Sequence, residues 1–157
     1  MTLCTFGYEG LELSDFIARL RAAGVHAVVD VRELPLSRKR GFSKRAFAEA
    51  LADAGIAYRH VPALGCPKPI RHRYRDDNDW SHYAKAFSSY LRQQTEAVAA
   101  LAKSAWKTKE CLVCFEADYA VCHRSIVARA VVACGGPAVV HLTATAAIPD
   151  ARLRAAA

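Results

Sequence analysis

The feature that most constrains this fold is a regular alternation of short apolar runs with segments of helical periodicity. The apolar runs occupy residues 2–6, 25–31, 56–61, 111–116 and 138–142. Each has the length of a strand, and residues 25–31 are too apolar for a strand with one face in water. Strands that alternate with helices favour parallel pairing, with helices covering both faces. The sequence therefore predicts an α/β fold with a doubly wound, Rossmann-like sheet of about five mainly parallel strands.

The segments between these runs predict four helices and one long loop. Helical spacing of apolar residues places the helices at residues 15–23, 44–54, 82–103 and 124–134. Residues 65–81 show neither periodicity and are dense in proline, arginine and aspartate. We predict a long basic loop at this position, of the kind that binds a ligand or closes over one as a lid.

Length and composition predict one globular domain. A chain of 157 residues, 53% hydrophobic and 24% charged, is long enough for one well-packed domain and short for two. We expect residues 1–142 to form this domain and residues 143–157 to form a tail, as a short helix or a frayed end. No apolar stretch approaches the roughly 20 residues that span a bilayer, and the first residues lack a signal-peptide pattern. We therefore expect a cytoplasmic protein with no membrane partner.

The charge is positive and unevenly distributed. The formal net charge is +7, and residues 38–75 hold ten Lys or Arg residues against two acids, Glu49 and Asp53. Such a local excess favours a phosphate-bearing partner, either a small molecule or a nucleic acid. A solvated basic surface is the alternative.

Residues 111–124 join a predicted strand end, a loop and a predicted helix start, and they hold most of the candidate chemistry. Cys122 is the first candidate for a catalytic residue, because the partial positive charge at a helix start favours a thiolate nucleophile. Glu116, which we place at the end of a buried strand, is a candidate general acid or base. Arg124 is a candidate for binding an anion. A structural thiol and a metal ligand are the alternatives for Cys122.

Further polar residues follow the other predicted strands. Carboxyl ends of parallel strands meet at one edge of a sheet, where ligands bind. Asp30 and Arg32 are two residues apart on a strand, so their side chains share a face. They form a structural ion pair, or Arg32 binds an anion while Asp30 orients it or acts as a third catalytic residue. The predicted substrate-binding residues are Tyr8, Arg32, Arg38, His60 and Arg124.

Cys114, Cys122 and His123 form an alternative metal or redox site, with Glu116 as a further ligand. Zinc binds such side chains at tetrahedral geometry, but their spacing matches no zinc finger. The first interpretation therefore contains no metal and no cofactor.

Several motifs carry a family resemblance. They are Thr5-Phe6-Gly7-Tyr8-Glu9-Gly10, Asp30-Val31-Arg32-Glu33-Leu34-Pro35-Leu36-Ser37-Arg38, Phe42-Ser43, Tyr58-Arg59-His60, Leu64-Gly65, Cys114-Phe115-Glu116 and Cys122-His123-Arg124. Together they resemble the domain-of-unknown-function family 488, from the first strand to the last helix. The resemblance implies an α/β fold and shared use of these positions, and it supplies no reaction.

Three functions are consistent with the sequence. The first is an enzyme acting on a nucleotide or nucleic acid, with an anion site at the strand ends. The second is a nucleic-acid-binding module without catalysis, in which the basic region of residues 38–75 dominates the affinity. The third is a metal- or redox-active protein that uses Cys114, Cys122 and His123.

Overall fold

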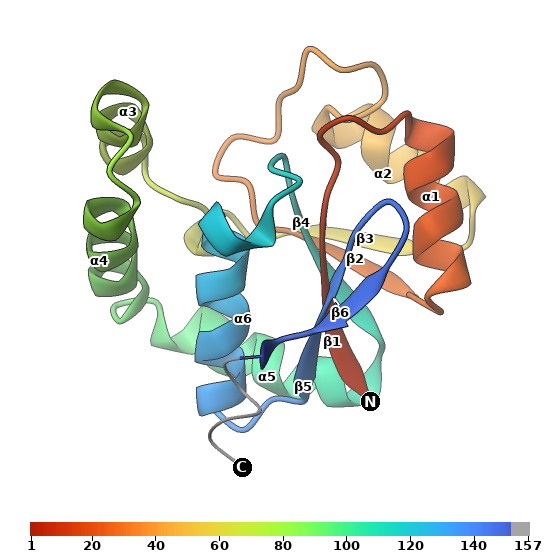
Figure 1. Ribbon diagram of the computed structural model, residues 1–157. Coiled ribbons are helices and arrows are strands. Elements are labelled where there is room, and N and C mark those ends of the chain that lie inside the picture. The colour runs from red at the N-terminus through yellow and green to blue at the C-terminus, as the bar shows by residue number, and fades with distance from the viewer. Residues whose placement is uncertain (152–157) are drawn as a thin grey trace.

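The computed structural model describes residues 1–151 and contains one six-stranded sheet in the order β3-β2-β4-β1-β5-β6 (Figure 1). The first five strands pair in parallel, and β6 pairs antiparallel with β5. This confirms the predicted α/β fold. The strands are β1 (Thr2–Gly7), β2 (Ala27–Asp30), β3 (Ala57–His60), β4 (Glu110–Cys114), β5 (Ala138–Leu142) and β6 (Ala147–Pro149).

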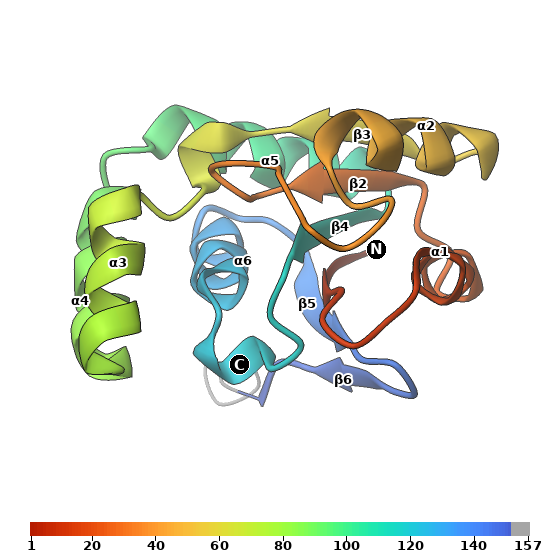
Figure 2. The ribbon, with the colours of Figure 1, turned by 90° about the horizontal axis from the view of Figure 1, so that it is seen from above.

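Helices cover both faces of the sheet, as predicted. They are α1 (Leu13–Ala22), α2 (Lys44–Asp53), α3 (Lys68–Asp77), α4 (Trp80–Leu91), α5 (Thr95–Lys107) and α6 (His123–Ala133), with short 3₁₀ turns at Pro62–Leu64 and Tyr119–Val121. Figure 2 shows α1 on one side of the sheet and α6 on the other, with α3 and α4 beyond α6.

The strands divide their side chains between two apolar clusters. Cys111 and Val113 pack with α1 and α2, whereas Leu112 and Cys114 pack with α4, α5 and α6. Successive residues of a strand point to opposite faces, so this alternation follows from the pleat. It also separates Cys111 from Cys114, as their three-residue offset predicts.

The predicted loop at residues 65–81 is wrong, because it contains α3 and the start of α4. None of the residues of α3 is buried, so the apolar periodicity by which a helix is recognised is missing. Asn78 ends α3 in a left-handed conformation, with φ of 51°, and Asp79 caps α4 through the backbone N–H of His82. The two helices therefore meet at a tight corner.

Two further boundaries differ from the prediction. The predicted helix at residues 82–103 is two helices, because the chain leaves helical geometry between Leu91 and Thr95. The predicted tail contributes β6, and residues 152–157 of that tail lie outside the described residues. Within residues 1–151, no helix is long and apolar enough to cross a membrane.

A buried polar chain anchors the β6 end of the sheet. The Nε2 atom of His141 lies 2.9 Å from Asp150 Oδ2, and its Nδ1 atom lies 2.7 Å from the hydroxyl of Thr5. Arg129 also donates to Asp150, at 3.1 Å. Because a carboxylate only accepts, His141 donates through Nε2 and receives a hydrogen bond from Thr5.

We expect His141 to make stability depend on pH. Burial lowers its pKa below the ordinary 6.5, although Asp150 opposes that shift. The folded state therefore holds His141 neutral. Its contribution to the free energy of unfolding is present above about pH 6.5 and is lost as the pH falls through the lowered pKa. Denaturant unfolding between pH 7 and pH 5 should show wild-type stability falling more steeply than that of His141→Gln.

The exposed His26 offers a matched control. His26→Gln should show the same pH dependence as wild type. An identical slope in wild type and His141→Gln would contradict this account.

Candidate functional site

A pocket of about 730 Å³ lies at the carboxyl ends of β1, β2 and β4, beside the start of α6. The segment after β2 forms one wall and α3 with α4 forms the opposite wall. Its lining residues are Tyr8, Arg32, Glu33, Leu34, Leu36, Ser37, Arg38, Cys66, Arg71, Tyr74, Arg75, Tyr83, Cys114, Phe115, Glu116, Val121, Cys122 and His123. This is the sheet edge where ligands of doubly wound folds bind.

Arg32 forms a fixed cationic wall of the pocket. Asp30 accepts two hydrogen bonds from its guanidinium, from Nε at 2.9 Å and from Nη2 at 2.7 Å. The other guanidinium nitrogen donates to the Phe42 carbonyl at 2.6 Å and to the Tyr8 hydroxyl at 3.1 Å. Burial alone would lower the pKa of Arg32, but the hydrogen bonds and charge of Asp30 raise it. Arg32 is therefore charged and held in one orientation.

Three more arginines line the pocket. Arg71 of α3 donates to Glu33 at 2.8 Å and to the Cys66 carbonyl at 3.0 Å, which ties α3 to the opposite wall. Arg38 and Arg75 are exposed, and neither forms a salt bridge with any residue of 1–151. These two arginines are available to an anionic ligand.

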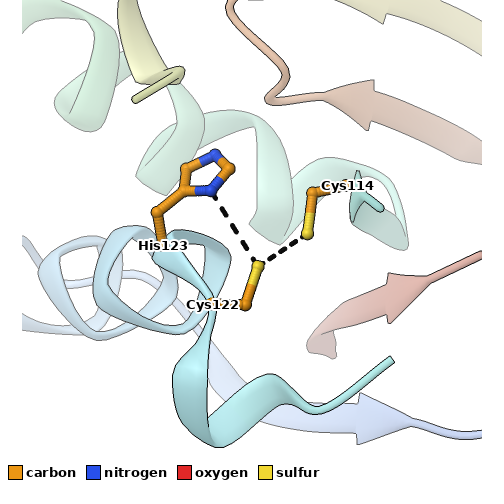
Figure 3. Close-up of side chains that lie close together, drawn as sticks. All are labelled: Cys114, Cys122 and His123. Atoms are coloured by element: carbon orange, nitrogen blue, oxygen red, sulfur yellow. Dashed lines mark hydrogen bonds between the residues drawn. The ribbon is translucent and has the colours of Figure 1, made fainter. Parts of the chain in front are cut away.

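Two thiols meet at the floor of the pocket (Figure 3). Cys114 is the last residue of β4 and Cys122 is the N-cap of α6. Their sulfur atoms are 2.7 Å apart, and both residues are buried. The Oε2 atom of Glu116 accepts from both thiols, at 3.3 and 3.4 Å. We expected Glu116 at the end of a buried strand, but β4 ends two residues earlier and Glu116 is exposed.

His123 presents a proton-accepting nitrogen to Cys122. Its Nε2 atom lies 2.7 Å from the Val31 carbonyl, which can only accept, so Nε2 carries the proton. The unprotonated Nδ1 atom then lies 3.9 Å from the Cys122 sulfur (Figure 3). Cys122 has an extended backbone, with φ of −136° and ψ of 140°, and His123 is the first residue of α6.

Arg124 lies behind the pocket and is fully buried. Its guanidinium donates to Cys114 Sγ at 3.0 Å, to the carbonyls of Glu116 and Ala117, and to the Thr5 hydroxyl at 3.3 Å. Burial alone would lower the pKa of Arg124, but the neighbouring Cys114 and Cys122 raise it. Arg124 therefore fixes the loop between β4 and α6 rather than facing a ligand.

Gly7 allows the loop between β4 and α6 to lie close against the end of β1. A Cβ atom at Gly7 would lie 1.7 Å from the Glu116 carbonyl oxygen. Only glycine lets the end of β1 pass so close to the loop, which explains this residue at the last position of β1.

Burial keeps two of the pocket thiols protonated. It raises the pKa of Cys114 well above its ordinary value, although Arg124 opposes the shift. Burial likewise raises the pKa of Cys66 to about 11. Near neutral pH, Cys114 and Cys66 are therefore neutral thiols.

The alternative metal site brings its three residues together. One ligand atom each from Cys114, Cys122 and His123 lies within 4.8 Å of the others. Two thiolates on one tetrahedral zinc ion would be about 3.8 Å apart, given Zn–S bonds of about 2.3 Å, whereas these sulfurs are 2.7 Å apart. Binding of one zinc ion would therefore require the two sulfurs to move about 1 Å further apart.

The predicted site residues fall into two groups. Tyr8, Arg32, Arg38, Glu116 and Cys122 line the pocket. Asp30, His60 and Arg124 are absent from its lining and support it from behind.

Asp30 and His60 both act on Arg32. Asp30 is fully buried and also accepts from the Tyr58 hydroxyl, at 2.6 Å. The Nε2 atom of His60 donates to the Arg32 carbonyl at 2.7 Å. Both residues therefore position Arg32.

Sequence reasoning missed one wall of the pocket and one neighbour of Cys122. Tyr74 belongs to α3, which the sequence predicts as part of a loop, and the helix predicted at residues 82–103 contains Tyr83 without indicating that it faces the pocket. The aromatic spacing of Tyr74, Trp80, Tyr83 and Phe87 is the available signal, since these rings form one continuous cluster that is stacked from Trp80 to Phe87 and edge-on or tilted at Tyr74. The sequence predicts His123 as a metal or redox ligand, but it does not predict the contact of His123 with the Cys122 sulfur, because adjacent residues of a helix point in different directions.

The comparisons with known proteins support the family resemblance. A family model described as domain of unknown function DUF488 matches residues 12–131. The match includes the motifs from Asp30 to Arg124 and leaves out the one at Thr5–Gly10. No match was found among the curated proteins or among the solved structures.

We expect the Asp30–Arg32 pair to be strongly coupled. Arg32→Met should lower the free energy of unfolding by about 3–5 kcal/mol, because it leaves a buried carboxylate without its partner. The double variant Asp30→Asn/Arg32→Met should recover much of that loss, since no charge is then left unpaired. Urea unfolding of the single and double variants measures both effects.

The exposed pair of Arg45 and Glu49 on α2 is the matched control. Arg45→Met should cost less than about 0.5 kcal/mol. A double variant no more stable than Arg32→Met would contradict the coupling.

Proposed function

The chain belongs to the DUF488 family, and we propose that it is an enzyme that acts on a phosphate-bearing substrate, a nucleotide or a nucleic-acid segment, with Cys122 as nucleophile. The observation that carries the proposal is that a thiol, a proton-accepting histidine nitrogen and four arginines share one pocket. A pocket that joins a nucleophile to anion-binding groups suits an anionic substrate.

The arginines support binding of phosphate. Arg38 and Arg75 lie on opposite walls without salt bridges to residues of 1–151, whereas the charge of Arg32 is paired with that of Asp30. Arginine presents several N–H donors in a planar fork that matches phosphate oxygens. A ligand between the two walls can therefore receive hydrogen bonds from both sides.

The pocket rim supports a substrate with an apolar or planar part. Four exposed apolar side chains lie on the lining, from Leu34, Leu36, Phe115 and Val121. Exposed large apolar side chains gathered at a pocket mark a surface that a ligand covers. Phe115 offers an aromatic face on which a base can stack. A nucleotide combines both requirements, because it carries a planar base and a phosphate.

His123 is the proposed base of the reaction. Its Nδ1 atom takes the proton of Cys122 as the sulfur attacks an electrophilic atom of the substrate, and the Val31 carbonyl keeps the ring oriented. The bond to the leaving group breaks as the S–substrate bond forms, and the leaving group receives the proton from Nδ1. Water then cleaves the S–substrate bond and restores the thiol. Glu116, which touches both sulfurs, is placed to exchange protons with that water.

A nucleic-acid-binding module without catalysis is the second candidate. It is favoured by exposed basic residues on both walls beyond the pocket, including Arg40, Lys44, Lys68 and Arg73. This candidate predicts that affinity falls steeply with salt. It gives no role to the arrangement of Cys122 and His123.

We expect Arg38→Gln and Arg75→Gln each to weaken binding of a nucleoside monophosphate or a short single-stranded oligonucleotide by about tenfold. One charge-assisted hydrogen bond contributes about 1.5–3 kcal/mol, and 1.4 kcal/mol corresponds to tenfold. Calorimetric titration measures the affinities. Arg45→Gln is the control, because Arg45 is exposed on α2 and does not line the pocket. Equal affinities of all three variants would contradict the proposed anion site.

Turnover separates the two candidates. Wild type and Cys122→Ser are incubated with mixed nucleotides and oligonucleotides, and the products are read by mass spectrometry. The enzyme proposal expects new products with wild type only, while both proteins bind equally well. Binding without conversion by wild type would support the second candidate.

A further inference from the structure

We propose that Cys114 and Cys122 form a reversible intramolecular disulfide, in which Cys122 reacts first with a hydroperoxide and Cys114 then resolves the oxidised sulfur. This would be a redox activity of the pocket beyond its proposed action on a phosphate-bearing substrate. It does not depend on which anion the pocket binds.

The geometry of the pair carries the inference. The two sulfurs are 2.7 Å apart, and a disulfide bond is about 2.05 Å long, so a shift of well under 1 Å joins them. The residues belong to different elements, β4 and α6, linked by the loop of residues 115–121. The dithiol and the disulfide therefore require nearly the same positions of β4 and α6.

The first step uses the groups around Cys122. The sulfur, which lines the pocket, attacks the terminal oxygen of the hydroperoxide while His123 Nδ1 accepts the thiol proton. The O–O bond breaks, and the departing oxygen takes that proton and leaves as an alcohol, or as water from hydrogen peroxide. Cys122 is oxidised by two electrons to a sulfenic acid, and the hydroperoxide is reduced by two electrons.

The second step uses the groups around Cys114. Its proton passes to Glu116 Oε2, 3.3 Å away, as its sulfur attacks the Cys122 sulfur. The S–O bond breaks and the hydroxide leaves as water with the proton from Glu116. Arg124, whose Nη1 atom lies 3.0 Å from Cys114 Sγ, stabilises the negative charge that develops on that sulfur. An external dithiol then reduces the disulfide and restores both thiols.

The other four cysteines lack this arrangement. Cys4 and Cys111 are buried in the cluster on the opposite face of the sheet. Cys134 is exposed at the end of α6, away from the pocket. Cys66 lines the pocket, and its sulfur makes a weak contact with the Pro67 carbonyl, at 3.8 Å. Cys66 and Cys134 therefore serve as internal controls for unspecific oxidation.

The test is made on the wild-type full chain. The protein is reduced with dithiothreitol, freed of reductant, treated with hydrogen peroxide, then denatured and alkylated with N-ethylmaleimide for peptide mass spectrometry. We expect a cross-linked peptide that joins Cys114 to Cys122, with Cys66 and Cys134 still alkylated. Renewed dithiothreitol should restore alkylation of both pocket thiols.

Two variants define the order of the steps. In Cys114→Ser, Cys122 should accumulate a sulfenic acid that dimedone traps, because the resolving thiol is gone. In Cys122→Ser, Cys114 should remain an alkylatable thiol. Near-UV circular dichroism establishes that each variant is folded before its result is used.

Three results would overturn the inference. They are a wild-type cross-link between another pair of cysteines, overoxidation of Cys122 without a cross-link, and a bound metal ion that keeps both thiols from peroxide. Elemental analysis of the reduced protein identifies the third result. The affinity for an anion is measured before and after oxidation, so that the disulfide and the proposed anion site are tested independently. The disulfide involves neither Arg38 nor Arg75. If the reduced wild-type protein binds no anion, that result would count against the proposed function and not against the disulfide.

Discussion

Removing a guanidinium from water costs several kcal/mol unless hydrogen bonds replace the lost solvation. The guanidinium of Arg124 is fully buried, and protein groups supply those hydrogen bonds. It donates to Thr5 on β1, to Cys114 at the end of β4 and to the carbonyls of Glu116 and Ala117. Through Thr5 the same chain of hydrogen bonds continues to His141. One buried cation thereby fixes the loop between β4 and α6, and with it the positions of both pocket thiols.

Much of the fold could be predicted because the central strands β1, β2 and β4 are buried on both faces. Apolar runs identify all five parallel strands, although β3 at the sheet edge has no buried residue, and helical spacing identifies α1, α2 and α6. The two elements that the sequence did not predict, α3 and β6, both lack a buried stripe. Helix α3 buries none of its residues, and all three residues of β6 are exposed. Their positions depend on tertiary contacts such as the hydrogen bonds of Arg71 and the ion pair of Asp150. No local sequence pattern predicts such contacts.

The candidate site was partly predictable for the same reason. The rule that ligands bind at strand carboxyl ends places Tyr8, Arg32 and Cys122 at one edge, and all three line the pocket. Which residues face the pocket could not be predicted, because side-chain direction changes within two residues at each strand end. Asp30 and Arg32 were expected on one strand face, but β2 ends at Asp30, and Asp30 is buried behind Arg32 and orients it.

The central claim is that Cys122 is an activated nucleophile in an anion-binding pocket. The direct test is the rate of Cys122 alkylation by iodoacetamide, resolved by peptide mass spectrometry, with and without a nucleoside monophosphate. The account predicts that Cys122 reacts faster than Cys66, that His123→Gln slows Cys122 alone, and that the nucleotide protects it. Equal rates at Cys122 and Cys66, unchanged by His123→Gln or by the nucleotide, would contradict the account.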